Sequence, residues 1–216
     1  MITKYGYDVF FTVALICAVA IVLSLLFIDP KIPRYGLVGV AVLILGLTIN
    51  FFRDPDRTIP PGNKLVLAPA DGKIIAVRQV MENEYIGAQA TLISIFMSPL
   101  DVHVNRIPMS GTVRYLRYVK GEYFAAFEDK ASEKNEQMVI GIENPGGRIL
   151  FKQIAGFVAR RIVCTLKTGD SVEAGTRFGM IKFGSRVDVF VPSGTSVKAK
   201  VGERAVAGET VLAELR

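Results

Sequence analysis

A Gly-Ser pair interrupts a strand-like run near the C-terminal end, in the stretch GMIKFGSRVDVFVPSG. Ser185 can act as a nucleophile, and the carbonyl of Gly184 is already bonded to it. Glycine has no Cβ to block approach and reaches backbone angles closed to other residues, so a strained Gly184–Ser185 peptide suits an N-to-O acyl shift. The resulting ester can break by β-elimination to dehydroalanine, which hydrolyses to a pyruvoyl group and ammonia. Taken alone, the pair is better explained as an ordinary bulge or turn.

The single histidine of the chain, His103, is a candidate general base. It stands in SPLDVHVNRIPMSG, with Asp101, Asn105 and Arg106 close by and prolines marking turns on both sides. Functional sites are often built where polar residues gather at the ends of strands. Histidine is the side chain whose charge changes most readily near neutral pH. A lone histidine can also be purely structural, so the local sequence leaves both roles open.

Asp71, in APADGKI, is the candidate acidic partner, although an Asp-Gly pair is also a common turn.

One histidine, dispersed acidic residues and two separate cysteines, Cys17 and Cys164, give no metal-ligand spacing, so we expect no metal. The cysteines are expected to be unreactive apolar residues. A net charge of +6 without tryptophan or a basic tract favours an anionic membrane surface over nucleic acid as partner.

Two uncharged apolar blocks, Val9–Ile28 and Tyr35–Phe52, precede these residues. Each reaches the roughly 18 to 20 residues that a helix needs to cross a bilayer. The linker Asp29–Arg34 contains two prolines and predicts a tight turn, so we expect residues 1–57 to form a helical hairpin that anchors the chain in a membrane. A signal peptide followed by a buried helix is the alternative, but the first block is long and lacks a basic leader.

Residues 58–216 have the pattern of a mainly β domain. Short apolar runs are separated by Gly, Pro, Asp and Asn, which is typical of a sandwich or barrel; they are Lys64–Val80, Ala90–Ser98, Gly111–Val119, Gln137–Gly156, Ala159–Asp170, Phe178–Gly184 and Arg186–Gly194. KTGDSVEAGTRF (167–178) and KVGERAVAGETV (200–211) form a weak repeat, and PADGKI, PMSGTV and PSGTSV are similar proline-led turns. These hairpins resemble the barrel-sandwich fold of biotinyl and lipoyl carrier domains, a likeness of fold alone.

FGSRVDVFVP, PADGK and SPLDVHVNRIP, together with a hydrophobic hairpin that ends in FFRDPDR, resemble the phosphatidylserine decarboxylases, in particular their short, archaeal-type class. The similarity spans essentially the whole chain. It implies a proenzyme that cleaves itself between Gly184 and Ser185. The products would be a membrane-attached β chain, residues 1–184, and an α chain, residues 185–216, whose N-terminal pyruvoyl cofactor is made from Ser185.

The resemblance also implies roles for three residues. His103 would take the proton of Ser185, and Asp71 would orient the imidazole and stabilise its charged form. Longer family members carry a second histidine where this chain has Arg106. His103 would therefore serve both self-processing and later proton transfer, or another group takes the second role.

The implied activity is that of a pyruvoyl-dependent carboxy-lyase. It would decarboxylate the serine headgroup of phosphatidylserine, or of an archaeal ether-lipid analogue, to the ethanolamine phospholipid through a Schiff base with the pyruvoyl group. The α and β chains would stay together as a heterodimer, with the order of further oligomerisation left open. Basic residues after the second apolar block favour a cytoplasmic catalytic domain at the inner membrane. Two of them, Arg53 and Arg57, could contact lipid phosphates or simply anchor the helix end.

A membrane-tethered carrier or adaptor domain of biotinyl or lipoyl type is the alternative function, and a structural anchor with a β domain is a third. Carrier domains present a modified lysine at the tip of a hairpin. The corresponding hairpin here carries FGSR, and Lys182 stands before the Phe. This position counts against a swinging arm.

Overall fold

The computed structural model describes residues 1–121, 135–156, 161–182 and 185–216. The chain falls into two compact units, Met1–Pro55 and Asp56–Arg216. The division lies two residues before the boundary expected from the sequence, at a Pro-Asp pair in the segment that follows the second apolar block.

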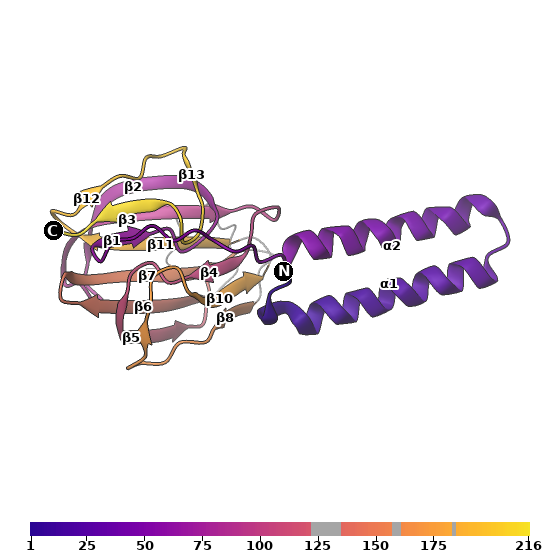
Figure 1. The fold of residues 1–216 in the computed structure, drawn as a ribbon, viewed down its shortest axis with the longest axis horizontal. Coiled ribbons are helices and arrows are strands. Elements are labelled where there is room, and N and C mark those ends of the chain that lie inside the picture. Colours follow the sequence, from indigo (N-terminus) through magenta and orange to yellow (C-terminus); the bar gives the residue numbers. More distant parts are fainter. Residues whose placement is uncertain (122–134, 157–160, 183–184) are drawn as a thin grey trace. The chain divides into compact units, whose positions relative to one another are not determined.

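The first unit is a helical hairpin in which two long helices run side by side (Figure 1). A 3-10 turn, Lys4–Gly6, leads into α1, Tyr7–Phe27, and α2 covers Lys31–Phe51. Most apolar side chains of both helices are exposed within the unit, and both helices are long and apolar enough to cross a membrane by length and composition. The hairpin therefore presents a hydrophobic surface that lipid would cover.

α2 begins at Lys31, four residues before the predicted apolar block. Pro33 allows this early start because it lies in the first turn, where a missing backbone N–H breaks no helical hydrogen bond. Lys31 and Arg34 thus belong to the helix rather than to the predicted turn. The Arg34 side chain donates to the carbonyl of Ile28, and the Ser24 hydroxyl donates to the carbonyl of Arg34 at 2.9 Å, which fixes the hairpin connection.

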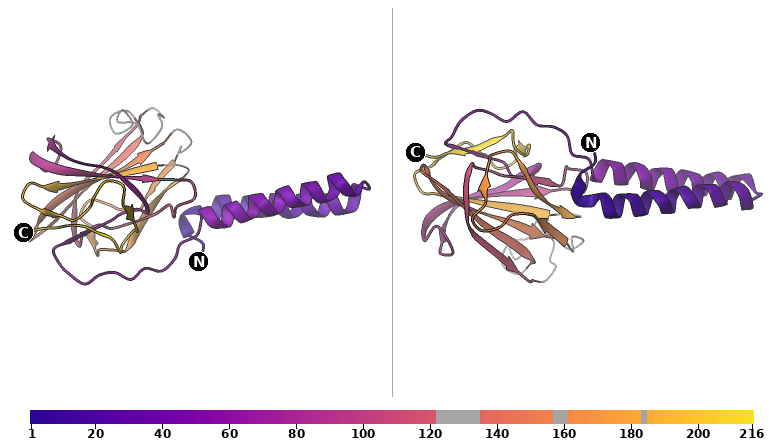
Figure 2. Two further views of the ribbon diagram at one scale, coloured as in Figure 1. Left: turned by 90° about the horizontal axis from the view of Figure 1, so that it is seen from above. Right: turned by 60° about the horizontal axis from the view of Figure 1, so that its bottom comes forward.

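The second unit contains three antiparallel sheets among its described residues (Figures 1 and 2). The large sheet has the order β13-β2-β3-β11-β7-β6-β5-β9, and its strands in chain order are β2 Gly72–Glu82, β3 Ala88–Met97, β5 Gly111–Val119, β6 Gln137–Asn144, β7 Gly147–Ala155, β9 Ser171–Val172, β11 Ser185–Pro192 and β13 Arg204–Ala205. The second sheet has the order β4-β10-β8, with β4 Val104–Arg106, β8 Arg161–Cys164 and β10 Arg177–Lys182. The third has the order β1-β14-β12, with β1 Leu65–Leu67, β12 Ser196–Val197 and β14 Val211–Glu214. The predicted fold class, a mainly β barrel-sandwich-like domain with an N-terminal helical hairpin, is confirmed.

One hydrophobic core joins the large sheet to the β4-β10-β8 sheet. The large sheet contributes alternate residues of its central strands, which are fully buried: Ile93, Ile95, Met97, Ile149, Phe151, Val187 and Val189. The smaller sheet contributes Phe178 and Ile181. The rings of Phe151 and Phe178 meet edge to face with their centroids 5.6 Å apart, so this aromatic pair ties the two sheets together.

The predicted repeat forms two copies of one turn structure. Gly169 and Gly202 have φ of +97° and +94°, and Gly175 and Gly208 have φ of +79° and +78°, a left-handed conformation that favours glycine. The strands within the copies, β9 and β13, form opposite edges of the large sheet. A Cβ on Gly208 would lie only 3.5 Å from the Cα of Gly175, so the large sheet curls until its two edges approach one another.

Both cysteines are free thiols, and they lie in different units. Burial raises the pKa of the Cys164 thiol, which keeps it protonated and weakly nucleophilic. This environment agrees with the expectation of an unreactive, space-filling residue.

Replacing Phe178 with alanine should lower the free energy of unfolding by about 3–5 kcal/mol, because it removes the aromatic contact between the two sheets. Tyr118→Ala is the control: Tyr118 is 55% exposed, and its loss should cost less than about 0.5 kcal/mol. Denaturant unfolding of the detergent-solubilised chain, followed by circular dichroism, measures both. Equal losses for the two variants would contradict the described core.

Candidate active site

The predicted scissile bond lies where the chain passes from one sheet to another. β10 ends at Lys182 and pairs with β4 and β8, whereas β11 begins at Ser185 and pairs with β3 and β7. Only two residues separate these strands, and both, Phe183 and Gly184, lie outside the described residues. A two-residue link normally closes a hairpin between paired neighbours. Here it joins strands of different sheets, and it is shorter than the other such passages between described strands.

Ser185 is fixed on both sides by the large sheet. It lies opposite Met97 of β3 and Ala155 of β7, and it is fully buried. Its hydroxyl donates to the thioether sulfur of Met97 at 3.1 Å. A thioether is a weak acceptor, so a more basic group that approached the hydroxyl would take the hydrogen bond readily.

His103 is also fully buried, and its ring is oriented by the chain itself. Nδ1 lies 2.9 Å from the backbone carbonyl of Asp101. Because a carbonyl oxygen only accepts, Nδ1 carries the proton, and in the neutral ring the lone pair is on Nε2. The His103 carbonyl in turn accepts from the N–H of Ile181 at 3.4 Å. This contact joins the histidine segment to the end of β10, four residues before Ser185.

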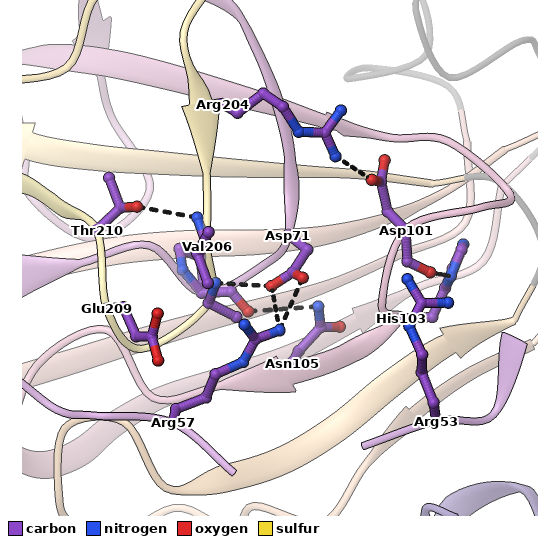
Figure 3. A network of polar contacts seen from close by, with 12 residues as sticks. Arg53, Arg57, Asp71, Asp101, His103, Asn105, Arg204, Val206, Glu209 and Thr210 are labelled. Atoms are coloured by element: carbon purple, nitrogen blue, oxygen red, sulfur yellow. Dashed lines mark hydrogen bonds and ion pairs between the residues drawn. The ribbon is translucent and has the colours of Figure 1, made fainter. Parts of the chain in front are cut away.

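Asp71 is bound to Arg57 and to a repeat turn (Figure 3). The Nη2 atom of Arg57 lies 3.0 and 2.7 Å from the two carboxylate oxygens of Asp71, and the N–H of Ala207 donates to Oδ1 at 2.8 Å. The resemblance implies that Asp71 orients the imidazole. In the structure the Asp101 carbonyl holds Nδ1, and the Asp71 carboxylate faces a guanidinium instead.

A comparison of two proline-led turns, PADGKI and PMSGTV, separates the capping role of the Asp71 side chain from its negative charge. Ser110 holds the same place in the second proline-led turn, where its hydroxyl accepts from the N–H of Ala174 at 2.9 Å. An uncharged serine is therefore sufficient to cap this kind of turn. The negative charge of Asp71 is additional, and it is directed at Arg57, whose side chain is 11% exposed.

The other arginines singled out by the sequence hold structural contacts. Arg106 donates to the carbonyl of Gly175 at 2.9 Å, so the residue at the second histidine position ties its strand to a repeat turn. Arg53 donates to the side chain of Asn50 at 2.6 Å within the hairpin unit. Phosphate binding by Arg57 would have to compete with its ion pair to Asp71, and the lipid-phosphate roles of Arg53 and Arg57 stay predictions.

Sequence reasoning missed two members of a buried polar network around Ser185. Gln153 donates to Asn105 Oδ1 at 2.8 Å, and Asn105 Nδ2 lies 3.9 Å from the sulfur of Met97, which also receives the Ser185 hydroxyl. Asn105 was visible as a polar neighbour of His103. Met97 and Gln153 stand in strand-like runs far away in the sequence, and the polar side chain of Gln153 in the inward row of its strand is the signal that could have found it.

Two alternatives for this region can be compared with the structure. Across the described ranges, no group of three or more His, Cys, Asp or Glu residues lies close enough to hold a metal ion. A carrier domain would need an exposed lysine at a hairpin tip, and Lys182, the lysine next to the Gly-Ser pair, is 5% exposed. Lys182 is therefore not an exposed lysine of the kind that a carrier domain presents.

Asp71→Ala should lower the free energy of unfolding by about 3 kcal/mol, because it leaves the mostly buried Arg57 unpaired. Asp71→Ser should recover about 1 kcal/mol of this loss by restoring the cap on Ala207. Ser110→Ala, the matched change in the other turn, should cost about 1 kcal/mol, since only a cap is lost there. Denaturant unfolding compares the three variants, and equal losses for Asp71→Ala and Ser110→Ala would contradict the added role of the ion pair.

Comparison with known proteins agrees with these features. A family model described as phosphatidylserine decarboxylase matches residues 44–213. Proteins named phosphatidylserine decarboxylase proenzyme are similar along almost the entire chain. The one from Chlorobium phaeobacteroides (strain DSM 266) is 46% identical over 98% of this chain and 99% of its own length. The one from Chlorobium limicola is 48% identical over 99% of both chains, and the one from Chlorobaculum tepidum is 45% identical over 99% of this chain and 97% of its own. With its sheet-to-sheet Gly-Ser junction, its buried histidine and this similarity from end to end, the chain belongs to the phosphatidylserine decarboxylase family.

Proposed function

We propose that this chain is a self-cleaving phosphatidylserine decarboxylase whose cofactor is a pyruvoyl group made from Ser185. The observation that carries the proposal is the position of Ser185, buried at the start of a central strand and two residues after a strand of another sheet. The family and the word proenzyme in the names of its relatives support a chain that is cut after synthesis.

Self-cleavage starts with proton transfer from Ser185. His103 Nε2 takes the hydroxyl proton, which the weak Met97 acceptor releases easily. The oxygen attacks the carbonyl carbon of Gly184, the peptide C–N bond breaks, and the Ser185 nitrogen gains a proton, which leaves an ester. Loss of the Ser185 α-proton then breaks the Cβ–O bond and frees the Gly184 carboxylate. Water converts the remaining dehydroalanine to the keto form and releases ammonia.

Asp71 would supply negative charge to this proton transfer, offset in part by its ion pair with Arg57. The carbonyl of Pro69, two residues before it, accepts from the backbone N–H of Arg106 at 2.9 Å, so the turn that carries Asp71 contacts the strand that follows His103. In a buried site a nearby carboxylate stabilises the protonated imidazole. Arg57 holds the carboxylate in place, which makes Arg57 a positioning residue.

The surroundings of residue 185 fit the proposed pyruvoyl group. A keto acyl group is no larger than the serine it replaces, and the ladder to Met97 and Ala155 would hold its amide in the same place. When formed, this group would serve as an electron sink for the electron pair that is left on the headgroup carbon when carbon dioxide departs. His103 would then return a proton to the carbon atom that lost the carboxylate.

The two products of cleavage would remain one folded unit. The segment after Ser185 contributes β11, β12, β13 and β14, and β11 lies between β3 and β7 in the middle of the large sheet. The α and β chains would thus be held together by backbone hydrogen bonds on both sides of β11 as a heterodimer.

The hairpin gives the enzyme access to a substrate that stays in the bilayer. Residues 1–57 would anchor the chain in the inner membrane, and residues 58–216 would form the catalytic domain on the cytoplasmic side, where anionic lipid attracts a chain of net charge +6. The reaction involves the serine headgroup alone, so both ester-linked and ether-linked lipids are substrates on this proposal.

Ser185→Ala should remain a single chain of 23.6 kDa, while the wild type splits at residue 184. His103→Gln should also remain uncut, because glutamine fills the space without acting as a base. Denaturing electrophoresis with intact-mass measurement reads the cut, and release of labelled carbon dioxide from carboxyl-labelled phosphatidylserine in detergent micelles reads decarboxylation. An uncut wild type, or a Ser185→Ala chain that still splits at this bond, would contradict the proposal.

Wild-type α and β chains should elute together from gel filtration in mild detergent and separate only in denaturant, because β11 is hydrogen-bonded on both sides. The uncut Ser185→Ala chain gives the reference elution volume. Spontaneous loss of the α chain in mild detergent would argue against the described pairing of β11.

A further inference from the structure

Gln153 is a polar residue in an apolar row. Its strand, β7, directs alternate residues into the core, and the neighbours of Gln153 in this row are Phe151 and Ala155. All three are fully buried. Burial of an amide is costly unless both of its polar atoms find hydrogen-bond partners.

Only one end of this amide is satisfied. Nε2 donates to Asn105 Oδ1 at 2.8 Å and lies 3.4 Å from the carbonyl of Val163. Oε1 has no hydrogen-bond partner within the part of the chain that the structure describes. A buried acceptor without a donor is uncommon in folded proteins and calls for an explanation, of which a bound ligand is one.

The orientation of both amides follows from their surroundings. Asn105 Nδ2 faces the carbonyl of Pro69 at 3.4 Å, and a carbonyl only accepts. Asn105 Oδ1 is therefore turned to Gln153, whose Nε2 must face it. This sequence of contacts leaves Gln153 Oε1 as the atom that needs a donor.

This oxygen belongs to the surroundings of residue 185. Gln153 lies opposite Val187, and Ser185 lies opposite Ala155, so Gln153 and Ser185 are diagonal neighbours on one face of the sheet. Diagonal pairs have Cα atoms about 7–8 Å apart, within reach of a long side chain. A chain of side-chain contacts through Asn105 and Met97 also connects Gln153 to Ser185.

We propose that Gln153 Oε1 accepts a hydrogen bond from the amino group of the lipid headgroup and so binds and orients the substrate amine. The inference rests on the proposed decarboxylase function and names one of its substrate-binding groups. A neutral acceptor in a buried site favours headgroups with an N–H over quaternary amines, which have none. With one N–H held by Gln153, another proton of the amine is left for His103 to remove.

Two variants separate this role from a structural one. Gln153→Met removes the acceptor and the donor, whereas Gln153→Glu keeps an acceptor, loses the donor to Asn105 and introduces an ionisable carboxyl group. Gln79→Met is the control, because Gln79 lies on β2 of the same sheet and its amide donates to Thr91 Oγ1 at 2.8 Å. Each purified protein is tested for cleavage by intact mass. Calorimetry then measures the binding of dihexanoyl phosphatidylethanolamine and dihexanoyl phosphatidylcholine below their micelle concentrations.

Gln153→Met should weaken binding of the ethanolamine lipid about tenfold, the effect of one lost buried hydrogen bond, and leave binding of the choline lipid unchanged. Gln153→Glu and Gln79→Met should retain the preference for ethanolamine. The inference would be overturned if Gln153→Met bound the ethanolamine lipid with wild-type affinity, or if Gln153→Met and Gln153→Glu lost equal affinity for it. Failure of both variants to cleave themselves would also overturn it. An uncut wild type would instead refute the proposed function, because the mass readout is independent of lipid binding.

Discussion

The fold depends on the hydrogen-bond ladders that hold two consecutive strands in different sheets. β10 is hydrogen-bonded to β4 and β8, and β11 is hydrogen-bonded to β3 and β7, so neither strand can shift towards the other without losing its own ladder. The chain passes from one sheet to the other between Lys182 and Ser185. Rigid strands on both sides of a short link are what a strained peptide bond needs, since strain persists only where the surroundings hold it in place.

Polar groups in the layer between these sheets are the second condition for the chemistry. His103, Asn105 and Gln153 are fully buried within an otherwise hydrophobic domain core, and each is oriented by a backbone carbonyl or by another amide. Fully enclosed hydrogen bonds are strong and fix side-chain orientation. The site thus combines strand residues such as Ser185 with His103 and Asp71, which stand directly before β4 and β2, and its precision comes from the same packing that stabilises the sandwich.

Local patterns in the sequence were enough to predict most of the elements, although β4 and β14 lie outside the predicted runs. Two uncharged blocks of sufficient length predict the hairpin, and the alternation of apolar and polar residues predicts strands. The spacing of glycines predicts the paired turns at Gly169 and Gly202. The start of α2 differs from the prediction, because Pro33 favours a turn in sequence terms but is also compatible with a first helical turn. Contacts between distant segments, such as Arg57 with Asp71 and Gln153 with Asn105, depend on the pairing of strands across the fold and leave no local pattern.

Complete burial of Ser185 sets an electrostatic limit on how the chain can end there. Ordinary proteolysis before this residue would create an ammonium group inside the domain, and an isolated charge in such a place is very unfavourable. A chain end that loses its nitrogen as ammonia carries no charge and can stay where the serine was. The depth of Ser185 in the sheet thus favours a new terminus without an amine, which allows the backbone to be broken in the middle of a folded core.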